Sequence, residues 1–293
     1  MIKELLDVYV PIASGLAFGY LSRPGEGELR LFARTVLYVF LTPLLFTSTY
    51  QRLSSSPASA PLALTALSAS LVVLTFAIAT KLHGDPELVL ASMYANAGYI
   101  PLGIAQSYWG SYGASAVGFY ILGNNFASNI LAPLALGGES GRLSPRKVLA
   151  FPPVYAILAA SALALAGVKL PELLLSPLAT LGGVAPTVAL VQLGMEVGAS
   201  VDANIVDGLK AYFTRLSVSV PLTLLFVEAG LATGIDAKIA IVESVMPSAV
   251  SCVVISRELK LDSRRVAGVV FTSTLVSTLL ALPVTLWLLS FTR

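Results

Sequence analysis

Long apolar stretches follow one another along the chain, separated by short segments of charged residues, glycine, proline and serine. A helix needs roughly 17–25 mainly apolar residues to cross a hydrocarbon core about 30 Å thick. We therefore predict an all-α membrane protein of ten transmembrane helices. The predicted spans are Leu5–Leu21, Phe32–Tyr50, Pro61–Thr80, Leu88–Trp109, Ala114–Leu136, Val148–Val168, Leu173–Ala199, Ala211–Leu231, Lys238–Ser256 and Val266–Phe291.

The composition excludes a water-soluble fold. Of the 293 residues, 56% are hydrophobic and 12% are charged, about half the charge of an ordinary soluble domain. The first stretch contains Pro11 and lacks a small-residue cleavage site, so we interpret it as a mature helix and not as a signal peptide. Cys252 and His83 are the only residues of their kinds. They exclude a disulfide framework and argue against a Cys/His metal centre or haem, so no cofactor is expected.

The positive charges predict an orientation. With ten spans, both termini and the even-numbered connections lie on one side, and the regions on that side hold 5 of the 18 cations. The other side holds 13, among which we count Arg215 near the start of the eighth span. The positive-inside rule then places both termini outside a plasma membrane and the central connection in the cytoplasm.

Prolines recur at matching positions in the two halves of the chain. The pairs are Pro11 with Pro152, Pro43 with Pro186, Pro101 with Pro247, and Pro133 with Pro283. We interpret residues 1–138 as a first repeat, 139–147 as a cytoplasmic loop and 148–293 as a second repeat. Each repeat has five spans, so the two would sit inverted in the membrane, as in many secondary transporters. Ordinary proline kinks are the alternative.

The fourth and ninth spans carry breaker residues at corresponding places. The fourth contains the segment Asn96–Gly103 with Pro101, and the ninth contains Glu243–Ser251 with Pro247. Proline removes an amide donor and glycine tolerates unwound dihedrals, so both helices are expected to open. Free N–H groups at half-helix ends suit a carboxylate, and free carbonyls suit a cation. We therefore expect an anionic substrate, with packing kinks as the alternative.

Intramembrane polar residues supply the candidate site. Glu243 lies near the middle of the ninth span, where a carboxylate is costly, and we expect it to couple transport to a proton or sodium ion. The alternative is that Glu243 lies at the membrane interface. For Glu196, Glu228 and Asp7 we expect an interfacial or ion-paired role. The expected substrate-binding residues are Asn96, Gly98, Tyr99, Pro101, Asn125, Asn129, Gln192, Pro247 and Ser248, and the expected ion-coupling residues are Glu243 and Ser251.

The asparagines of the fifth span form a stripe. Asn125, Ser128 and Asn129 share one face at 100° per residue, and the tenth span has hydroxyl residues between Thr272 and Thr278. These polar faces either line a cavity or join helices by hydrogen bonds, and for Asn96 the alternatives are a substrate ligand or a bond between helices. Gln192 faces either the substrate path or a dimer contact. The chain lacks a phosphate-binding loop, a nucleophile elbow and a selectivity-filter signature. We therefore predict a secondary transporter, not an enzyme, with lipid and a small organic anion as partners and no nucleic acid.

Short motifs in consistent order resemble the auxin efflux carrier family, which includes plant auxin carriers and prokaryotic malate or malonate permeases. They are Leu41-Thr-Pro-Leu-Leu-Phe46, Asn96-Ala-Gly-Tyr, Phe151-Pro-Pro153, Gln192-Leu-Gly-Met195, Glu243-Ser-Val-Met-Pro247 and Ser273-Thr-Leu-Val-Ser277. The chain departs from the family at Pro101-Leu102-Gly103, where members usually have Gly-Leu-Pro, and it lacks the long central loop of many plant carriers.

The resemblance implies a fold similar to the sodium/bile-acid symporters and sodium/proton antiporters, with the fourth and ninth helices crossing at their broken centres. Spans 1, 2, 6 and 7 would form a scaffold, often homodimeric, against which spans 3–5 and 8–10 move like an elevator. The substrate would be a mono- or dicarboxylate such as malate, malonate or an auxin-like anion. An uncoupled, potential-driven exporter and a membrane sensor or channel remain alternatives.

Overall fold

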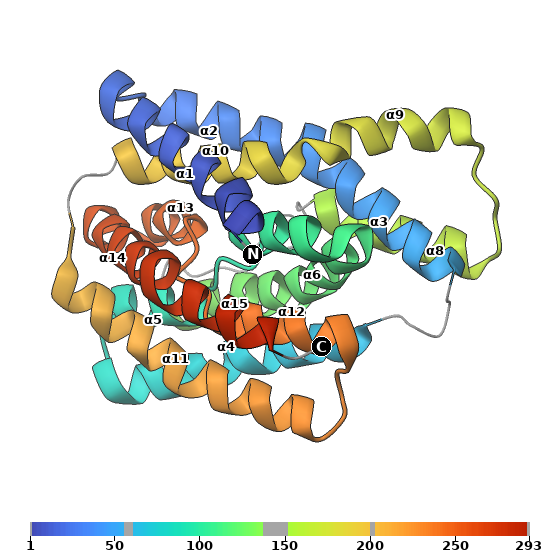
Figure 1. Ribbon diagram of the computed structural model, residues 1–293. Coiled ribbons are helices and arrows are strands. Elements are labelled where there is room, and N and C mark those ends of the chain that lie inside the picture. Colours follow the sequence, from blue (N-terminus) through green and yellow to red (C-terminus); the bar gives the residue numbers. More distant parts are fainter. Residues whose placement is uncertain (1, 56–60, 137–151, 200–202, 292–293) are drawn as a thin grey trace. The chain divides into compact units, whose positions relative to one another are not determined.

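The computed structural model describes residues 2–55, 61–136, 152–199 and 203–291, and every regular element in these ranges is a helix (Figure 1). The all-helical class is therefore confirmed. The helices are α1 Ile2–Ser22, α2 Glu26–Thr35, η1 Val36–Leu41, α3 Thr42–Ser55, α4 Leu62–His83, α5 Pro86–Met93, α6 Tyr99–Leu136, α8 Pro152–Leu165, α9 Glu172–Gly183, α10 Ala185–Ala199, α11 Ile205–Glu228, α12 Gly234–Ser244, α13 Ser251–Glu258, α14 Ser263–Val276, η4 Ser277–Ala281 and α15 Leu282–Ser290.

Four continuous helical stretches in these ranges are long and apolar enough to cross a membrane. They are Glu26–Ser55, Leu62–His83, Glu172–Ala199 and Ser263–Ser290, and the apolar helices Leu6–Ser22 and Pro152–Leu165 are shorter. The fourth and ninth predicted spans do not qualify because each is interrupted: α5, α12 and α13 have only 8, 11 and 8 residues. The structure thus agrees with a membrane protein, and the number of ten spans stays a prediction.

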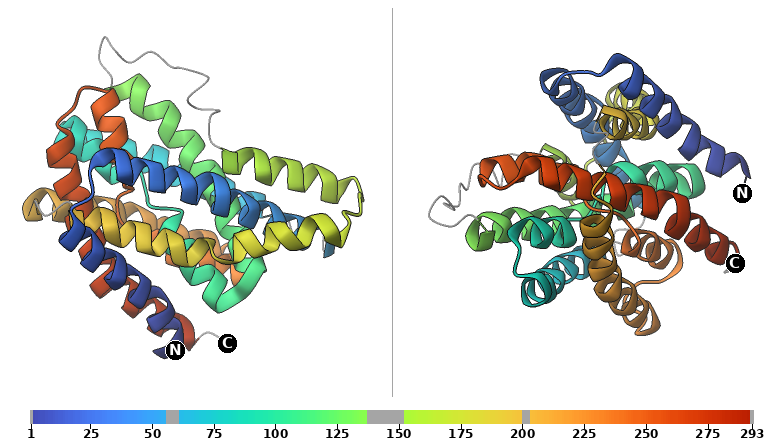
Figure 2. Two further views of the ribbon diagram at one scale, coloured as in Figure 1. Left: turned by 90° about the horizontal axis from the view of Figure 1, so that it is seen from above. Right: turned by 90° about the vertical axis from the view of Figure 1, so that its left-hand side faces the viewer.

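Two wide π-helical turns each end two residues before a proline. In η1 the turn precedes Pro43, and in η4 it precedes Pro283. A proline has no N–H to donate, and its ring clashes with the carbonyl four residues earlier. A turn with one extra residue relieves that clash without ending the helix. As a result α14, η4 and α15 form one continuous helical segment (Figure 2).

The chain forms two compact units, which are described separately. Unit 1 comprises residues 1–62, 98–119 and 151–199, and unit 2 comprises residues 63–97, 120–150 and 200–293. Each unit takes helices from both halves of the sequence. The long α6 contributes to both, and it bends at Gly110, whose φ of 58° and ψ of −148° lie outside the helical region. This bend falls between the predicted fourth and fifth spans.

Unit 1 is built on close packing of α1 against α10 (Figures 1 and 2). A Cβ atom at Gly15 would lie 2.1 Å from the carbonyl oxygen of Val191, and one at Gly194 would lie 2.1 Å from that of Ile12. Gly19 and Gly198, one turn further along each helix, are equally confined. Small residues spaced by four allow membrane helices to approach at backbone distance. The contacts rise together in residue number, so α1 and α10 run parallel.

Unit 2 packs α4, α5 and the second part of α6 with α11 to α15. Its apolar core includes Leu90 and Met93 of α5, Cys252 of α13 and Val266 and Val270 of α14. Asparagine and aspartate side chains cap three of its helices by accepting backbone N–H groups. Asp85 caps α5, Asn204 caps α11 and Asp262 caps α14.

Candidate functional site

Two interrupted helices meet inside unit 2. The chain leaves helical geometry between α5 and α6, at residues 94–98, and again between α12 and α13, at residues 245–250. The second break lies within the predicted segment Glu243–Ser251, whereas the first overlaps only the start of Asn96–Gly103, because Pro101 belongs to the first turn of α6. Ala95 and Ser248 form an antiparallel bridge. The Asn96 N–H donates to the Pro247 carbonyl at 2.8 Å, and the Ala249 N–H donates to the Tyr94 carbonyl at 2.8 Å. The extended segments therefore satisfy part of each other's backbone, which water could not do in a membrane.

Side chains from α11 and η4 satisfy the carbonyls at the end of α12. The hydroxyl groups of Tyr212 and Ser277 both donate to the Val245 carbonyl at 2.8 Å. The Ser219 hydroxyl donates to the Ser244 carbonyl. A helix end leaves its last carbonyls without intrahelical partners, and a buried end requires partners from elsewhere. The neighbouring helices therefore hold the interrupted segment in place.

Arg215 supplies the next donor, and its position corrects the sequence interpretation. We counted Arg215 among the cytoplasmic cations, whereas the structure places it midway along α11 with 1% of its surface exposed. Its Nε donates to the Met246 carbonyl at 3.0 Å. The signal was present in the sequence, because Arg215 lies inside the predicted eighth span, where a charge usually has a function.

Glu243 is an acidic residue within electrostatic range of this arginine. It is the penultimate residue of α12, is 0% exposed, and neither of its carboxylate oxygens has a hydrogen-bond partner in the described part of the chain. The Arg215 guanidinium attracts it electrostatically, and Tyr120 of α6 also lies within electrostatic range. The Nη1 atom of Arg215 likewise has no hydrogen-bond partner within those ranges. Glu243 and Arg215 are thus two buried groups of opposite charge that attract each other and share no hydrogen bond.

The other side of the junction is held by α5, α6 and α14. The Ser248 hydroxyl donates to the Ala91 carbonyl at 2.7 Å, and the Ser248 N–H donates to the Ser273 hydroxyl oxygen at 3.3 Å. The Asn124 side-chain amide donates to the Ala95 carbonyl at 3.3 Å. Both predicted substrate-binding residues of the ninth span, Pro247 and Ser248, therefore belong to the junction.

The predicted asparagine stripe of the fifth span faces the junction. The Tyr94 hydroxyl donates to Oδ1 of Asn125 at 3.3 Å and lies 3.5 Å from Oδ1 of Asn129. Both asparagines are half-buried, whereas Ser128 is fully buried. Ser251, predicted to bind an ion, begins α13 with an exposed side chain and makes no hydrogen bond to Glu243.

Four other predicted residues lie in unit 1. Gln192 is fully buried on α10, and its Nε2 donates to the Tyr99 hydroxyl at 3.4 Å and to Oε1 of Glu196 at 2.8 Å. Gly98 precedes α6, and Pro101 occupies the first turn of that helix, where the missing N–H costs nothing. Gln192 and Tyr99 are thus brought together, and Glu196 is bonded to an amide.

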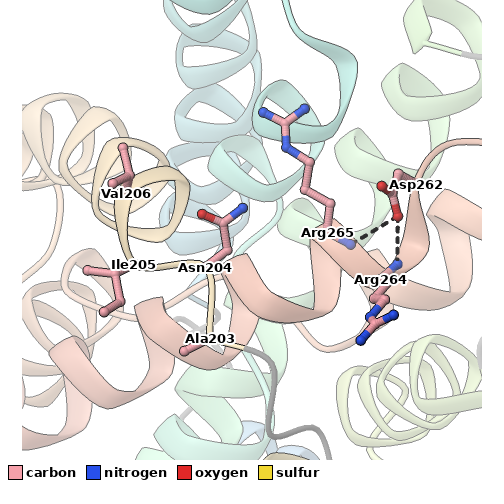
Figure 3. A pocket seen from close by; sticks show the side chains of 7 residues that line it. All are labelled: Ala203, Asn204, Ile205, Val206, Asp262, Arg264 and Arg265. Atoms are coloured by element: carbon pink, nitrogen blue, oxygen red, sulfur yellow. Dashed lines mark hydrogen bonds between the residues drawn. The ribbon is translucent and has the colours of Figure 1, made fainter.

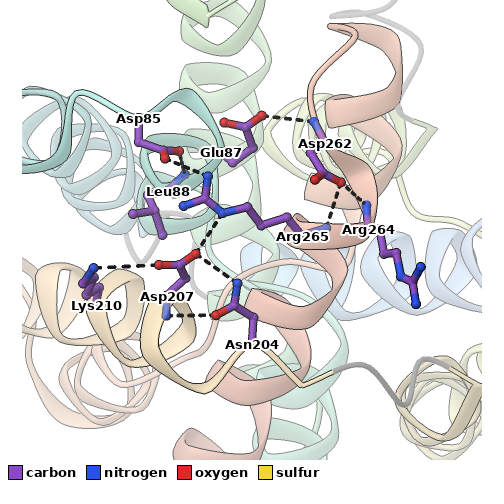
Figure 4. A network of polar contacts seen from close by, with 9 residues as sticks. All are labelled: Asp85, Glu87, Leu88, Asn204, Asp207, Lys210, Asp262, Arg264 and Arg265. Atoms are coloured by element: carbon purple, nitrogen blue, oxygen red, sulfur yellow. Dashed lines mark hydrogen bonds and ion pairs between the residues drawn. The ribbon is translucent and has the colours of Figure 1, made fainter.

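A charged network that no motif predicted joins three helix N-termini of unit 2 (Figure 4). Arg265 of α14 contacts Asp85 with Nη1 at 2.7 Å and Asp207 with Nε at 2.8 Å. Lys210 lies 3.9 Å from Asp207. The hydrogen bond from Arg265 holds the pKa of Asp207 below its ordinary value of 3.8. The network ties α5, α11 and α14 together at the ends that precede their apolar spans.

Beside this network lies an open pocket of about 550 Å³, lined by residues 203–206 and by Asp262, Arg264 and Arg265 (Figure 3). The Asp262 carboxylate already has hydrogen-bond partners in this pocket, because it accepts the backbone N–H groups of Arg264 and Arg265. Unit 1 has a second pocket of about 470 Å³ between α1, α6 and the α9–α10 segment, with Asp7 and Gln106 on its wall. Among the described residues no group of three acidic, histidine or cysteine side chains is placed to hold a metal ion.

Comparison with known proteins relates this chain to membrane transporters. Residues 138–288 match the family described as membrane transport protein. An uncharacterized transporter of Methanothermobacter thermautotrophicus is 27% identical, and the alignment covers 97% of this chain and 96% of the relative. An uncharacterized transporter of Methanocaldococcus jannaschii is 26% identical over 68% of this chain and 66% of its own length.

Proposed function

The chain belongs to the membrane transport protein family, and from that premise we propose that it is a secondary active transporter of small organic anions. The substrate class is mono- and dicarboxylates such as malate or malonate, with an auxin-like anion as a further member. Two relatives that bear the name of transporter support the transport function, and one of them aligns along nearly the whole chain. Neither name states a substrate.

One observation carries the substrate class: two helices are interrupted at the same place in unit 2, where Asn96 and Pro247 are bonded to each other. The second interruption is followed by a half-helix N-terminus at Ser251 in the same unit. The positive dipole end of such a terminus favours a carboxylate. In secondary transporters the substrate site commonly lies at discontinuous helices. Asn96, Asn125 and Asn129 supply polar groups at this place, and we propose that they bind substrate.

We propose alternating access by relative movement of the two units. Unit 1 contains the predicted spans 1, 2, 6 and 7, which would be the scaffold, and unit 2 contains spans 3 and 8–10. Two inverted repeats of five helices, residues 1–138 and 148–293, a homodimeric scaffold, and extracytoplasmic termini in the plasma membrane belong to the same proposal. The compactness of each unit supports it, because an elevator needs two bodies that move without unfolding.

Two versions of this proposal differ in the energy source that drives transport. In the first, Glu243 couples substrate movement to a proton or a sodium ion, with Ser251 assisting. In the second, transport is uncoupled and follows the membrane potential. A specific observation favours the second version: the charge of Glu243 already has Arg215 as an opposite neighbour inside the same unit.

Uptake of labelled malate into proteoliposomes tests the proposal, with proton, sodium and electrical gradients imposed one at a time. Asn125→Ala should lower uptake by about tenfold or more, because a hydrogen bond to a charged group contributes roughly 1.5–3 kcal/mol. Phe126→Ala is the matched control, since Phe126 is the next residue of α6 and is 60% exposed. It should transport like the unmodified protein.

Other outcomes would overturn the proposal in distinct ways. Malate binding without uptake under any gradient would favour a sensor, and currents far above carrier turnover would favour a channel. Absence of both binding and uptake for malate, malonate and an auxin in folded protein would refute the substrate class.

A further inference from the structure

The end of α12 is a concentrated negative site. The helix dipole places roughly half a negative charge at a C-terminus, and Glu243 adds a carboxylate there with no hydrogen-bond donor on either oxygen within the described ranges. The carbonyls of Ser244, Val245 and Met246 follow immediately. Unwound carbonyls and half-helix C-terminal ends are the groups with which secondary transporters coordinate sodium. This end of α12 therefore requires a positive charge.

Arg215 meets that requirement from within the protein. Its guanidinium is almost completely buried, its Nε is bonded to the Met246 carbonyl at 3.0 Å, and its charge attracts Glu243. An arginine stays protonated in proteins, so this charge is permanent. The hydroxyl groups of Tyr212 and Ser277 neutralise the neighbouring Val245 carbonyl but carry no charge. Arg215 is thus the cation that offsets the negative end of α12.

We propose that Arg215 is a resident cation, occupying the place where a coupling sodium ion would otherwise bind beside Glu243. The substrate anion then moves without sodium, and Arg215 acts as a positioning residue that holds the interrupted segment through the Met246 carbonyl. The consequence for transport rests on the proposed function, whereas the cation-binding consequence does not. Removal of the guanidinium should leave the Glu243 carboxylate and the Met246 carbonyl without their cation, while the Ser244 and Val245 carbonyls keep their hydroxyl donors. That arrangement should bind sodium.

Thermal unfolding of the purified full chain in detergent tests this without any substrate. The melting temperature is measured in sodium chloride and in choline chloride at equal ionic strength. The unmodified protein and Arg215→Lys, which keeps the charge, should melt at the same temperature in both salts. Arg215→Gln should be less stable in choline and should gain roughly 3 °C or more in sodium at about ten times its dissociation constant.

Two further variants separate cation binding from repair of a damaged core. Arg215→Gln combined with Glu243→Gln should lose the sodium effect, because the carboxylate is needed to bind the ion. Arg52→Gln is the matched control: Arg52 is also buried, in unit 1, with its guanidinium over the Tyr112 ring. It should be destabilised equally in both salts.

Three results would overturn the proposal. One is sodium stabilisation of the unmodified protein that Glu243→Gln abolishes, which would mean that the ion binds with Arg215 present. The second is a folded Arg215→Gln variant that melts identically in both salts. The third is sodium stabilisation of Arg52→Gln as large as that of Arg215→Gln. The comparison of the unmodified protein with Glu243→Gln remains possible even if Arg215→Gln fails to fold. All three results are melting temperatures and do not depend on malate uptake, so they are distinguishable from a failure of the transport proposal.

Discussion

Replacing Gly194 with alanine is expected to force α1 and α10 apart. The added Cβ would lie 2.1 Å from the Ile12 carbonyl oxygen and 2.7 Å from the Leu16 nitrogen. Carbon and oxygen atoms normally approach to about 3.3 Å at closest, so the two helices must separate by roughly 1 Å. The obstacle is backbone, which cannot turn aside as a side chain would.

The cost follows from overpacking. An added methyl group in a tightly packed core costs about 1–3 kcal/mol, and contact with backbone places Gly194→Ala at the upper end. For a protein of this size that corresponds to a melting temperature lower by roughly 6–10 °C. Gly15→Ala disturbs the same helix contact from the α1 side, because its Cβ would lie 2.1 Å from the Val191 carbonyl oxygen of α10. The double variant should therefore cost less than the sum of the two single variants.

The assay is thermal unfolding in detergent, followed by tryptophan fluorescence and by size-exclusion chromatography of the heated sample. Gly27→Ala is the control, because a Cβ at Gly27 in α2 meets nothing within 4 Å. It should leave the melting temperature unchanged or raise it slightly. If Gly194→Ala and Gly27→Ala melt at the same temperature, α1 and α10 are not in backbone contact and the reasoning fails.

Three further predictions concern other parts of the chain. Tyr212→Phe removes one of two hydroxyl donors to the Val245 carbonyl and should lower the free energy of unfolding by about 1 kcal/mol. The change is measured as a shift in melting temperature, and an unchanged melting temperature would refute a role for that hydrogen bond. Gly110→Ala places a side chain at a φ of 58° and should cost about 1–3 kcal/mol although nothing crowds the position, so an unaltered melting temperature would contradict the strained bend. The pKa of Asp207 outside the predicted span is lowered by Arg265, so its contribution to stability is present above pH 3.8 and is lost as the pH falls further. Arg265→Gln should therefore show a weaker loss of melting temperature than the unmodified protein between neutral pH and about pH 3, and parallel pH profiles would refute this.

Local sequence signals predicted the helical class, the family and the two interruptions. Helix class followed from apolar stretches, which depend only on neighbouring residues. Proline and glycine in the segments Asn96–Gly103 and Glu243–Ser251 predicted the two interruptions. In the first segment the break lies at residues 94–98, before Pro101, which occupies the first turn of α6. The resemblance to the auxin efflux carriers is confirmed by the family match. The inverted repeat, the domain division and the site assignments stay predictions.

The contacts of Arg215 could not be predicted from local signals. It donates to the Met246 carbonyl just beyond the end of α12 and attracts Glu243 near that end, both about thirty residues away in the sequence. Only the docking of α11 beside α12 brings them together, and charge counting assigns such a residue to a loop. The bond between Gln192 and Tyr99 likewise depends on how α10 packs beside α6. Side-chain partners across helices require tertiary structure, which no single stretch encodes.

The parallel contact of α1 with α10 decides whether the chain crosses the membrane an odd or an even number of times between them. If both helices cross the membrane in the same direction, the chain leaves α1 on one face and must enter the α9–α10 segment from the opposite face. The polypeptide between them must then traverse the bilayer an odd number of times, and five crossings fit whereas four or six do not. The close approach of two backbones, at Gly15 and Gly19 of α1 and Gly194 and Gly198 of α10, thereby limits the number of crossings between them to an odd one.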